Sequence, residues 1–295
     1  MIRGSTDLTS NLMKKTSPPH YFLNFINFVV IASIFLLTSC GGTSSTPPNP
    51  PNIQANNLFY GVKANFFVGV TSLNDGIKIA VSNCNNLTQV TSSSPQYLAY
   101  SCTIAQTGSL SLSATDASGN VLLTKNFTVP APQVSLVTSQ GTVVLELYPN
   151  AAPLSVNNFL QYVQTGFYTN TIFHRVISGF VVQGGGFLTG MVPKTPTYSA
   201  IPLESQNGLS NVRGSLAMAR TSDPNSGTSQ FYVNLVDNLS LDYVNASNPG
   251  YAVFGKVVSG LDVIDNIAKS PTNTVNGYAD VPVTDVTITS VTRTQ

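Results

Sequence analysis

Charged residues are scarce in this chain. Only 8% of the 295 residues are charged, thirteen basic against twelve acidic, for a net charge of +1, whereas soluble domains average about 25%. The basic residues form no clusters, and a nucleic-acid-binding protein needs a concentrated basic surface to displace counterions from phosphates. DNA or RNA is therefore excluded as the main partner. The 42% of hydrophobic residues likewise excludes a disordered polyelectrolyte.

Several common catalytic groups are also missing. The chain has two histidines, of which His20 lies in the N-terminal leader, so a Ser–His–Asp triad would have to use His174. No GxSxG elbow accompanies it. No CxxC or His-rich cluster indicates a metal site, and the glycines 184–186 lack the GK[ST] of a phosphate-binding loop. We therefore expect no metal and no cofactor. Ser, Thr and Asn take the place of the missing charges, which favours β-structure and an extracytoplasmic location.

The N-terminus reads as an export signal. Lys14 and Lys15 precede an apolar run over residues 21–37, the order found in a secretory signal peptide. The run ends in Leu37-Thr38-Ser39-Cys40, which resembles a bacterial lipobox. We expect residues 1–39 to be a lipoprotein signal peptide and Cys40 to be lipidated; a plain signal peptide or an uncleaved anchor is the alternative. The start is either Met1 or Met13.

The other two cysteines, Cys84 and Cys102, form an even pair in an oxidising compartment. A disulfide between them would close a loop of about 19 residues and stabilise the fold by roughly 3 kcal/mol. Two buried free thiols are the alternative.

A linker and a first domain follow Cys40. Residues 40–56 are rich in Gly, Ser and Pro, which predicts a semi-rigid tether. Over residues 57–132, apolar residues alternate with polar ones, as at Leu110, Leu112 and Ala114, and residues 116–120 form a turn cluster. About six strands and no helical period predict a small β-sandwich, for which the immunoglobulin-like fold is one candidate.

Residues 133–295 predict a second, mainly β domain. Residues 134–137 and 142–148 read as a hairpin around Gln140-Gly141, and residues 281–292 as a closing strand. Residues 153–164 have the spacing of an amphipathic helix, with Gly166 as a stop, and Val263, Ile264 and Ile267 mark a second, short helix. Many strands and two helices without βαβ alternation predict a closed antiparallel β-barrel.

The densest unusual segment is residues 173–187, FHRVISGFVVQGGGF. At strand period Arg175 shares a face with Phe173 and Ile177, while His174 points the other way and is expected to be a hydrogen-bonded structural residue. An arginine in an apolar strand is costly to bury unless its donors find partners. The glycine triplet predicts a turn that permits close strand approach.

This segment resembles the cyclophilin family of peptidyl-prolyl isomerases, whose hallmark is close to FHRxIxGFxxQGG. Two further family stretches follow in order: Met218-Ala219 with Ser229-Gln230-Phe231-Tyr232, and Leu241-Asp242 with VFGKV at residues 253–257. The segment YAVFGKVVSGLDVID, residues 251–265, is similar to the sequences of the bacterial extracytoplasmic branch of this family.

The resemblance implies a mechanism and a set of site residues. Arg175 would be the catalytic donor that stabilises the prolyl nitrogen lone pair. The substrate-binding residues would be Phe180, Val181, Gln183, Met218, Ala219, Arg220, Gln230, Tyr232, Leu241 and Tyr251. The implied partners are proline-containing polypeptides.

Some positions depart from the best-known cyclophilins. Ser240 stands where many members have a tryptophan at the pocket rim, Arg220 replaces an asparagine, Tyr251 a histidine and Tyr232 a phenylalanine. The lost tryptophan surface predicts weak cyclosporin binding.

Three hypotheses follow. The first is a lipid-anchored prolyl isomerase of the bacterial cell envelope, monomeric, held to the membrane by its lipid, that acts on exported proteins; Gly41 after the lipidated cysteine favours the outer membrane. The second is a non-catalytic binding protein for proline-containing segments. The third makes the sandwich the functional part, as an adhesin or scaffold.

Overall fold

The computed structural model describes residues 51–70 and 76–295. The predicted signal peptide, Cys40 and most of the predicted linker lie outside the described residues. Within them, no helix combines the length and the apolar character that a membrane span requires.

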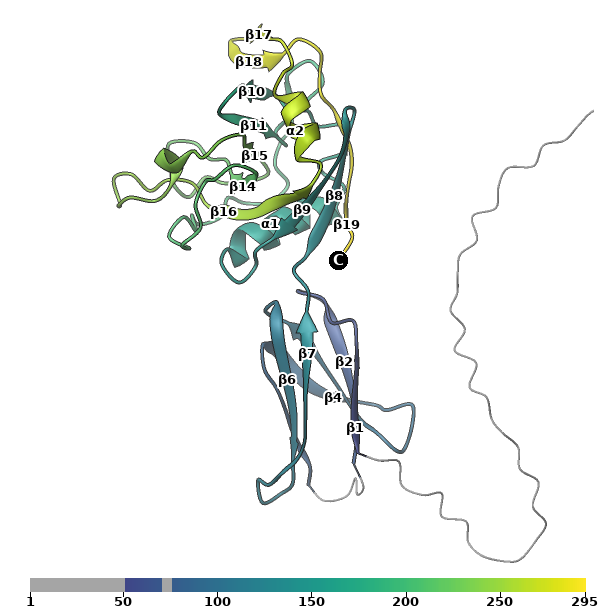
Figure 1. Cartoon of the computed structure of the whole chain (residues 1–295). Coiled ribbons are helices and arrows are strands. Elements are labelled where there is room, and N and C mark those ends of the chain that lie inside the picture. Colours follow the sequence, from purple (N-terminus) through teal and green to yellow (C-terminus); the bar gives the residue numbers. More distant parts are fainter. Residues whose placement is uncertain (1–50, 71–75) are drawn as a thin grey trace, which may run out of the picture. The chain divides into compact units, whose positions relative to one another are not determined.

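The first domain is a β-sandwich of two antiparallel sheets (Figure 1). Its strands are β1 (Asn52–Asn56), β2 (Lys63–Gly69), β3 (Lys78–Val81), β4 (Cys84–Val90), β5 (Leu98–Ile104), β6 (Gly108–Thr115) and β7 (Val121–Val129). The predicted alternation is observed on β6, where Leu110, Leu112 and Ala114 are all buried. Residues 52–56 were assigned to the linker by composition, yet they form β1 because they pair with β2.

The strand order of the sandwich is that of a constant-type immunoglobulin domain. The sheets have the orders β1-β2-β5-β4 and β3-β6-β7, which correspond to the ABED and CFG sheets. The disulfide differs from that fold, because Cys84 on β4 is bonded to Cys102 on β5 within one sheet, whereas the immunoglobulin bridge joins the two sheets. The two Cα atoms are 5.7 Å apart. The disulfide prediction is confirmed and the free-thiol alternative is wrong.

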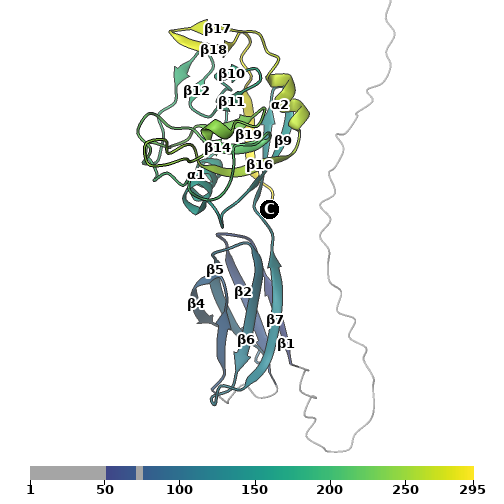
Figure 2. The same cartoon turned by 60° about the vertical axis from the view of Figure 1, so that its left-hand side comes forward.

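The second domain is built on one eight-stranded antiparallel sheet that curls on itself (Figure 2). Its order is β10-β11-β15-β14-β16-β9-β8-β19. The strands are β8 (Gln133–Thr138), β9 (Gly141–Leu147), β10 (Arg175–Ile177), β11 (Val181–Gly184), β14 (Ser215–Met218), β15 (Phe231–Asn234), β16 (Val253–Ser259) and β19 (Ile288–Arg293). Two small hairpins are added: β12 (Phe187–Leu188) with β13 (Val192–Pro193), and β17 (Thr272–Val275) with β18 (Tyr278–Pro282).

The barrel closes through a short backbone contact instead of a full ladder. Edge strands β10 and β19 do not pair directly. The residues before each of them do, through an isolated bridge between Ile172 and Thr287 and a 3.0 Å hydrogen bond from Phe173 N to Val286 O. The predicted closing strand over residues 281–292 is interrupted, because β18 pairs with β17 and β19 pairs with β8. The mainly β fold class with two short helices is confirmed.

Helix α1 (Pro153–Gln164) has the bounds expected from its periodicity. Val156, Phe159, Tyr162 and Val163 are buried in the core of the barrel. Ala152, at the N-cap, has no side chain that can accept a hydrogen bond, and the carboxylate of Glu204 accepts from Leu154 N at 2.9 Å and Ser155 N at 2.7 Å. A residue fifty positions away therefore caps the helix.

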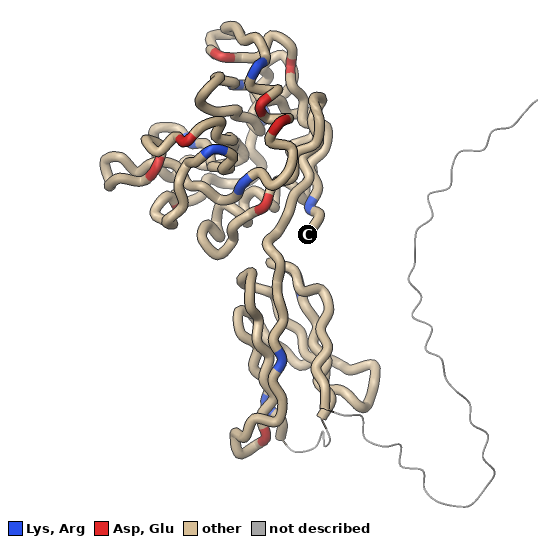
Figure 3. Tube along the Cα trace, in the orientation of Figure 1, with Lys and Arg blue, Asp and Glu red and all other residues tan. Residues whose placement is uncertain are grey.

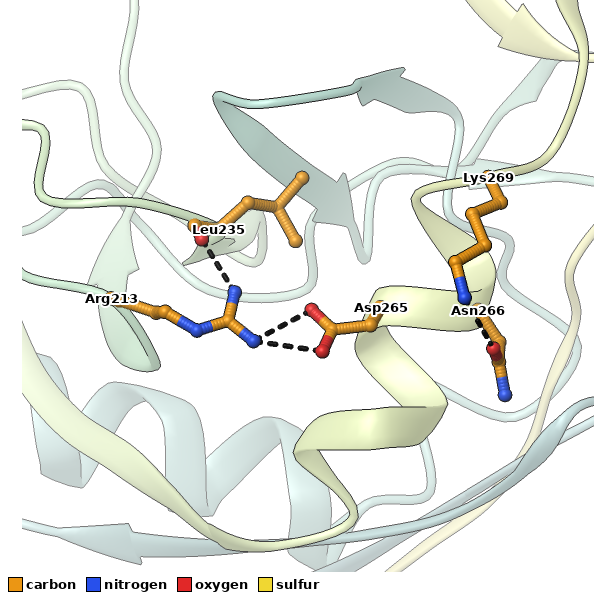
Figure 4. Close-up of polar contacts among 5 residues, drawn as sticks. All are labelled: Arg213, Leu235, Asp265, Asn266 and Lys269. Carbon is orange, nitrogen blue, oxygen red and sulfur yellow. Dashed lines mark hydrogen bonds and ion pairs between the residues drawn. The ribbon is translucent and has the colours of Figure 1, made fainter.

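Helix α2 (Leu261–Ile267) is fastened to the loop after β15 by one arginine (Figure 4). Arg213 donates from Nη2 to both carboxylate oxygens of Asp265, at 2.9 and 2.7 Å, and from Nη1 to Leu235 O at 2.6 Å. Ile264 and Ile267 lie on the buried side of the helix. Just beyond the end of α2, Lys269 donates from Nζ to Asn266 Oδ1 at 3.3 Å.

Candidate active site

Four neighbouring strands bring hallmark residues and Ala217 onto one face of the sheet. Arg175 on β10 lies opposite Gln183 on β11, and Gln183 lies opposite Tyr232 on β15. Tyr232 in turn lies opposite Ala217 on β14. Directly opposed residues of antiparallel strands point to the same side, so residues far apart in sequence form a continuous row across the sheet.

A cavity of about 280 Å³ opens beside this row. It is lined by Arg175, Phe180, Val181, Gln183, Ala219, Arg220, Tyr232, Leu241 and Tyr251. Every one of these residues belongs to the set predicted from sequence. Val181, Ala219 and Tyr232 belong to a small hydrophobic cluster. The partly buried side chains of Phe180, Leu241 and Tyr251 pack against it. The cavity therefore offers apolar walls with an arginine at its edge.

The guanidinium of Arg175 is weakly held. Among the described residues its hydrogen-bond partner is Gln183, whose Oε1 lies 3.4 Å from Nη1. The Oδ2 of Asp280 lies 4.0 Å from Nε, and both side chains are about 40% exposed. An arginine carries five N–H donors, so donors of Arg175 stay available to a ligand in the cavity.

Gln183 is itself oriented by Gln230. Its Nε2 donates to Gln230 Oε1 at 3.0 Å, which turns its Oε1 towards Arg175. Gln230 does not line the cavity and acts on it through Gln183. The glycine triplet makes room for this amide: a Cβ on Gly186 would lie 2.5 Å from Gln230 Cδ. A Cβ on Gly185 would lie 2.9 Å from the backbone oxygen of Ser229, so the predicted close approach of strands at the triplet is confirmed.

Tyr232 is fixed by a buried polar network. Its hydroxyl donates to Asn211 Oδ1 at 2.8 Å, and Asn211 donates from N and Nδ2 to Asp242 Oδ1 at 2.7 and 2.9 Å. Burial raises the pKa of the Tyr232 hydroxyl far above its usual value, so the group stays neutral. The sequence analysis did not identify Asn211 as part of the site. The available signal was the Leu241-Asp242 motif, because the Asp242 carboxylate accepts the hydrogen bonds of Asn211.

Comparison with known proteins agrees with the geometry. The family model "cyclophilin type peptidyl-prolyl cis-trans isomerase/CLD" matches residues 133–293, which is more than half of the chain. The chain belongs to the cyclophilin family of peptidyl-prolyl cis-trans isomerases.

The cyclophilin domain is similar to individual known proteins. The cyclophilin domain is 52% identical over 160 residues to a peptidyl-prolyl cis-trans isomerase of Acinetobacter baylyi, covering 54% of this chain and 83% of that protein. It is 49% identical to peptidyl-prolyl cis-trans isomerase B of Escherichia coli, covering 54% and 98%. It is also similar to a Cryptosporidium parvum cyclophilin crystallised with the dipeptide Ala-Pro, at 28% identity and a TM-score of 0.48, covering 55% of this chain and 99% of that one.

Met218 does not lie where the sequence predicted, and Arg220 makes hydrogen bonds that the sequence did not predict. Met218 lies opposite Phe231 in the β14–β15 register, so its side chain points into the barrel core, where it is buried. It does not line the cavity. Arg220 does line it, but donates to Gly250 O at 3.0 and 2.9 Å and to Thr221 O at 2.8 Å, with its guanidinium 4.5 Å from the Tyr251 ring. Those bonds hold the rim of the cavity together.

His174 directly precedes β10. The sequence predicted that it points away from Arg175, yet it lines a cavity together with Arg175, Gln183 and Gln230. It is 5% exposed and its ring centroid is 4.6 Å from that of Phe187. Its Nδ1 is buried without a hydrogen-bond partner among the described residues, but the ring interacts with the Ile172 backbone and the Gln230 side chain, as expected of a hydrogen-bonded structural residue. Burial lowers the pKa of His174 to about 4, although the Ile172 backbone and Gln230 favour the protonated ring. The imidazole is therefore neutral at pH 7.

Proposed function

We propose that the cyclophilin domain isomerises X–Pro bonds of exported polypeptides and that Arg175 is its catalytic residue. The observation that carries this proposal is the position of a weakly held guanidinium at the edge of an apolar cavity. An X–Pro bond resists rotation by roughly 18–20 kcal/mol because the nitrogen lone pair is delocalised into the carbonyl. A donor that stabilises the lone pair on nitrogen lowers this barrier.

The proline ring would occupy the apolar part of the cavity. Phe180, Val181, Tyr232 and Leu241 provide the walls. An N–H donor of Arg175 would then approach the prolyl nitrogen as the bond twists, and Gln183 would hold the guanidinium in that direction. The proposed reaction involves no nucleophile and no proton transfer. It requires only binding of the proline ring, desolvation of the amide and the oriented charge of Arg175.

The required acceleration is within reach of such a site. Uncatalysed isomerisation takes tens of seconds, and turnover in milliseconds requires about four powers of ten, or roughly 5–6 kcal/mol. Preorganised donors at a developing charge typically supply about 3–4 kcal/mol each. Desolvation of the amide in the apolar cavity would contribute the remainder.

A protease-coupled isomerisation assay on an Ala-Pro peptide tests the assignment. We expect Arg175→Ala to reduce kcat/KM about a hundredfold. Arg175→Lys should recover only a small part of the activity that Arg175→Ala loses, because lysine keeps the charge but lacks the planar guanidinium. Lys78→Ala, which removes an exposed cation from the sandwich, is the control and should leave the rate unchanged.

Two outcomes of this assay contradict the proposal. Full activity in Arg175→Ala would remove the catalytic role of the arginine. A wild type that binds proline peptides without accelerating isomerisation would favour the non-catalytic binding protein instead.

We further propose that the protein is a lipoprotein of the cell envelope, anchored through Cys40. The lipobox-like residues 37–40 support this location, and so does the Cys84–Cys102 disulfide, since disulfides persist in oxidising compartments. Intact-mass measurement of the membrane fraction is the test. A mature species that still carries residues 21–39, or a Cys40→Ala variant that stays on the membrane, would contradict lipid anchoring.

A further inference from the structure

A second cavity lies next to the proline cavity, on the other side of Arg175. Its volume is about 480 Å³, and it shares Arg175 and Gln183 with the first cavity. Its other walls are His174, Phe187, Gln230 and residues 277–280. Since two side chains belong to both cavities, the cavities meet at Arg175 and Gln183.

The outer wall of this cavity is the β17–β18 hairpin. Asn276 and Gly277 form its two-residue turn, with φ values of +51° and +83°, and Val275 pairs with Tyr278 across it. This is the sequence and geometry of a type I′ turn. Strand β18 packs against β10, the strand that carries Arg175 (Figures 1 and 2).

Aromatic rings make up one side of the cavity. The Tyr278 ring meets the Phe187 ring edge-on at 5.1 Å, and Phe187 contacts His174 at 4.6 Å. Tyr278 is 45% exposed. A large aromatic side chain left open to solvent at a cavity mouth is a surface on which another ring can stack.

The charges around the cavity cancel locally. Asp280, held at a φ of +62°, places its carboxylate 4.0 Å from Arg175 Nε. His174 is uncharged at pH 7, because burial lowers its pKa to about 4. Gln230 adds a neutral amide. The cavity therefore presents aromatic rings and one pair of opposite charges, Arg175 and Asp280. Such a surface suits a large apolar side chain better than a charged one.

We propose that this cavity is a second substrate subsite, which takes an aromatic side chain from a residue within two positions of the proline, with Tyr278 as the residue that selects it. An extended peptide advances about 3.3–3.6 Å per residue, so one or two residues carry the chain from the proline cavity across Arg175. The inference rests on the proposed function, because it assumes that a proline occupies the first cavity.

The test compares short peptides that contain one proline and are otherwise alanine. Phenylalanine is placed in turn at each of the two positions before and after the proline. We expect phenylalanine at one of these positions to raise both the affinity, measured by calorimetry, and kcat/KM about two- to tenfold over alanine. Tyr278→Ala should bring this ratio close to one, whereas Tyr278→Phe should keep it.

Two more variants control the experiment. Phe59→Ala removes an aromatic side chain of similar exposure, 40%, from the sandwich and should leave the ratio as in the wild type. Ala279→Trp adds bulk to an exposed residue of the cavity wall and should lower the affinity for the phenylalanine peptide more than for the alanine peptide. It tests the subsite even if Tyr278→Ala disturbs the hairpin.

The outcomes separate the two proposals. Equal affinity for phenylalanine and alanine at all four positions, or a preference that survives in both Tyr278→Ala and Ala279→Trp, overturns the subsite. A calorimetric preference that depends on Tyr278, in a protein without isomerase activity, supports the subsite while contradicting the proposed function.

Discussion

Three arginines of the cyclophilin domain show how partners determine the role of a residue. Arg213 is bonded to Asp265 and Leu235, and Arg220 to Gly250 and Thr221. Among the described residues, Arg175 has one long hydrogen bond of 3.4 Å and a distant carboxylate. The first two arginines hold the fold together, and the third keeps the donors that the proposed mechanism requires.

The contact between Asp280 and Arg175 predicts a modest effect on catalysis. Asp280→Asn removes the carboxylate that faces Nε at 4.0 Å while keeping its shape. Exposed pairs at such distances contribute about 0–1 kcal/mol, so we expect kcat/KM for an all-alanine proline peptide to change less than fivefold, and the change to shrink at 1 M salt. A loss as large as that of Arg175→Ala would show that the carboxylate is indispensable.

His174 predicts a pH dependence of stability. Its pKa is about 4 in the folded state and about 6.5 when unfolded. The folded state thus binds fewer protons between these values, and the stability present above pH 6.5 is lost as the pH falls towards 4. Urea unfolding should give a free energy lower by about 2 kcal/mol at pH 5 than at pH 7.

A His174→Phe variant provides the comparison for that measurement. It keeps a ring beside Phe187 and removes the titrating group, so its free energy of unfolding should change less between pH 7 and pH 5. Equal slopes in the two proteins would mean that other groups cause the acid sensitivity.

Among the elements, β11 shows how register divides side chains between core and cavity. Its residues alternate, so Val181 and Gln183 line the cavity while Val182 is buried in the barrel core. The same parity puts Met218 of β14 into the core. A motif states which residues are present, and the pairing of strands decides which side each one faces.

Helix α1 depends on a cap from outside its own sequence. Glu204→Ala removes the acceptor of Leu154 N and Ser155 N, and loss of a cap costs about 1 kcal/mol. We expect a decrease of that size in the free energy of unfolding from urea titrations. Glu146→Ala, on strand β9 and away from the helix start, is a comparison for the loss of a carboxylate. An unchanged stability in Glu204→Ala would show that water replaces the cap.

The disulfide predicts a stability effect confined to the sandwich. Replacing Cys84 and Cys102 together by serine frees a loop of about 19 residues and should destabilise that domain by roughly 3 kcal/mol. Circular dichroism melts with and without reductant measure it, and the isomerase assay should give the wild-type rate. A parallel fall in activity would indicate that the cyclophilin domain needs the folded sandwich.

Over the whole molecule, the low content of charged residues is compatible with the proposed mechanism, which needs little acid–base chemistry. Figure 3 shows the acidic and basic residues scattered along the described chain. A reaction driven by binding and one oriented donor requires neither a cluster of carboxylates nor a nucleophile. The described structure also gives the first domain an immunoglobulin-type strand order, which the alternating pattern had left as one candidate.

Local sequence was sufficient for the family, the mainly β class, α1, the disulfide and the cavity-lining residues, because each depends on short motifs, periodicity or cysteine parity. It failed where distant segments meet. The cap of Glu204 on α1, the hydrogen bonds of Arg220 to Gly250, the inward side chain of Met218, and the approach of Asp280 to Arg175 all depend on strand register and closure of the barrel. These contacts join residues up to about a hundred positions apart, and only packing of the complete sheet brings them together.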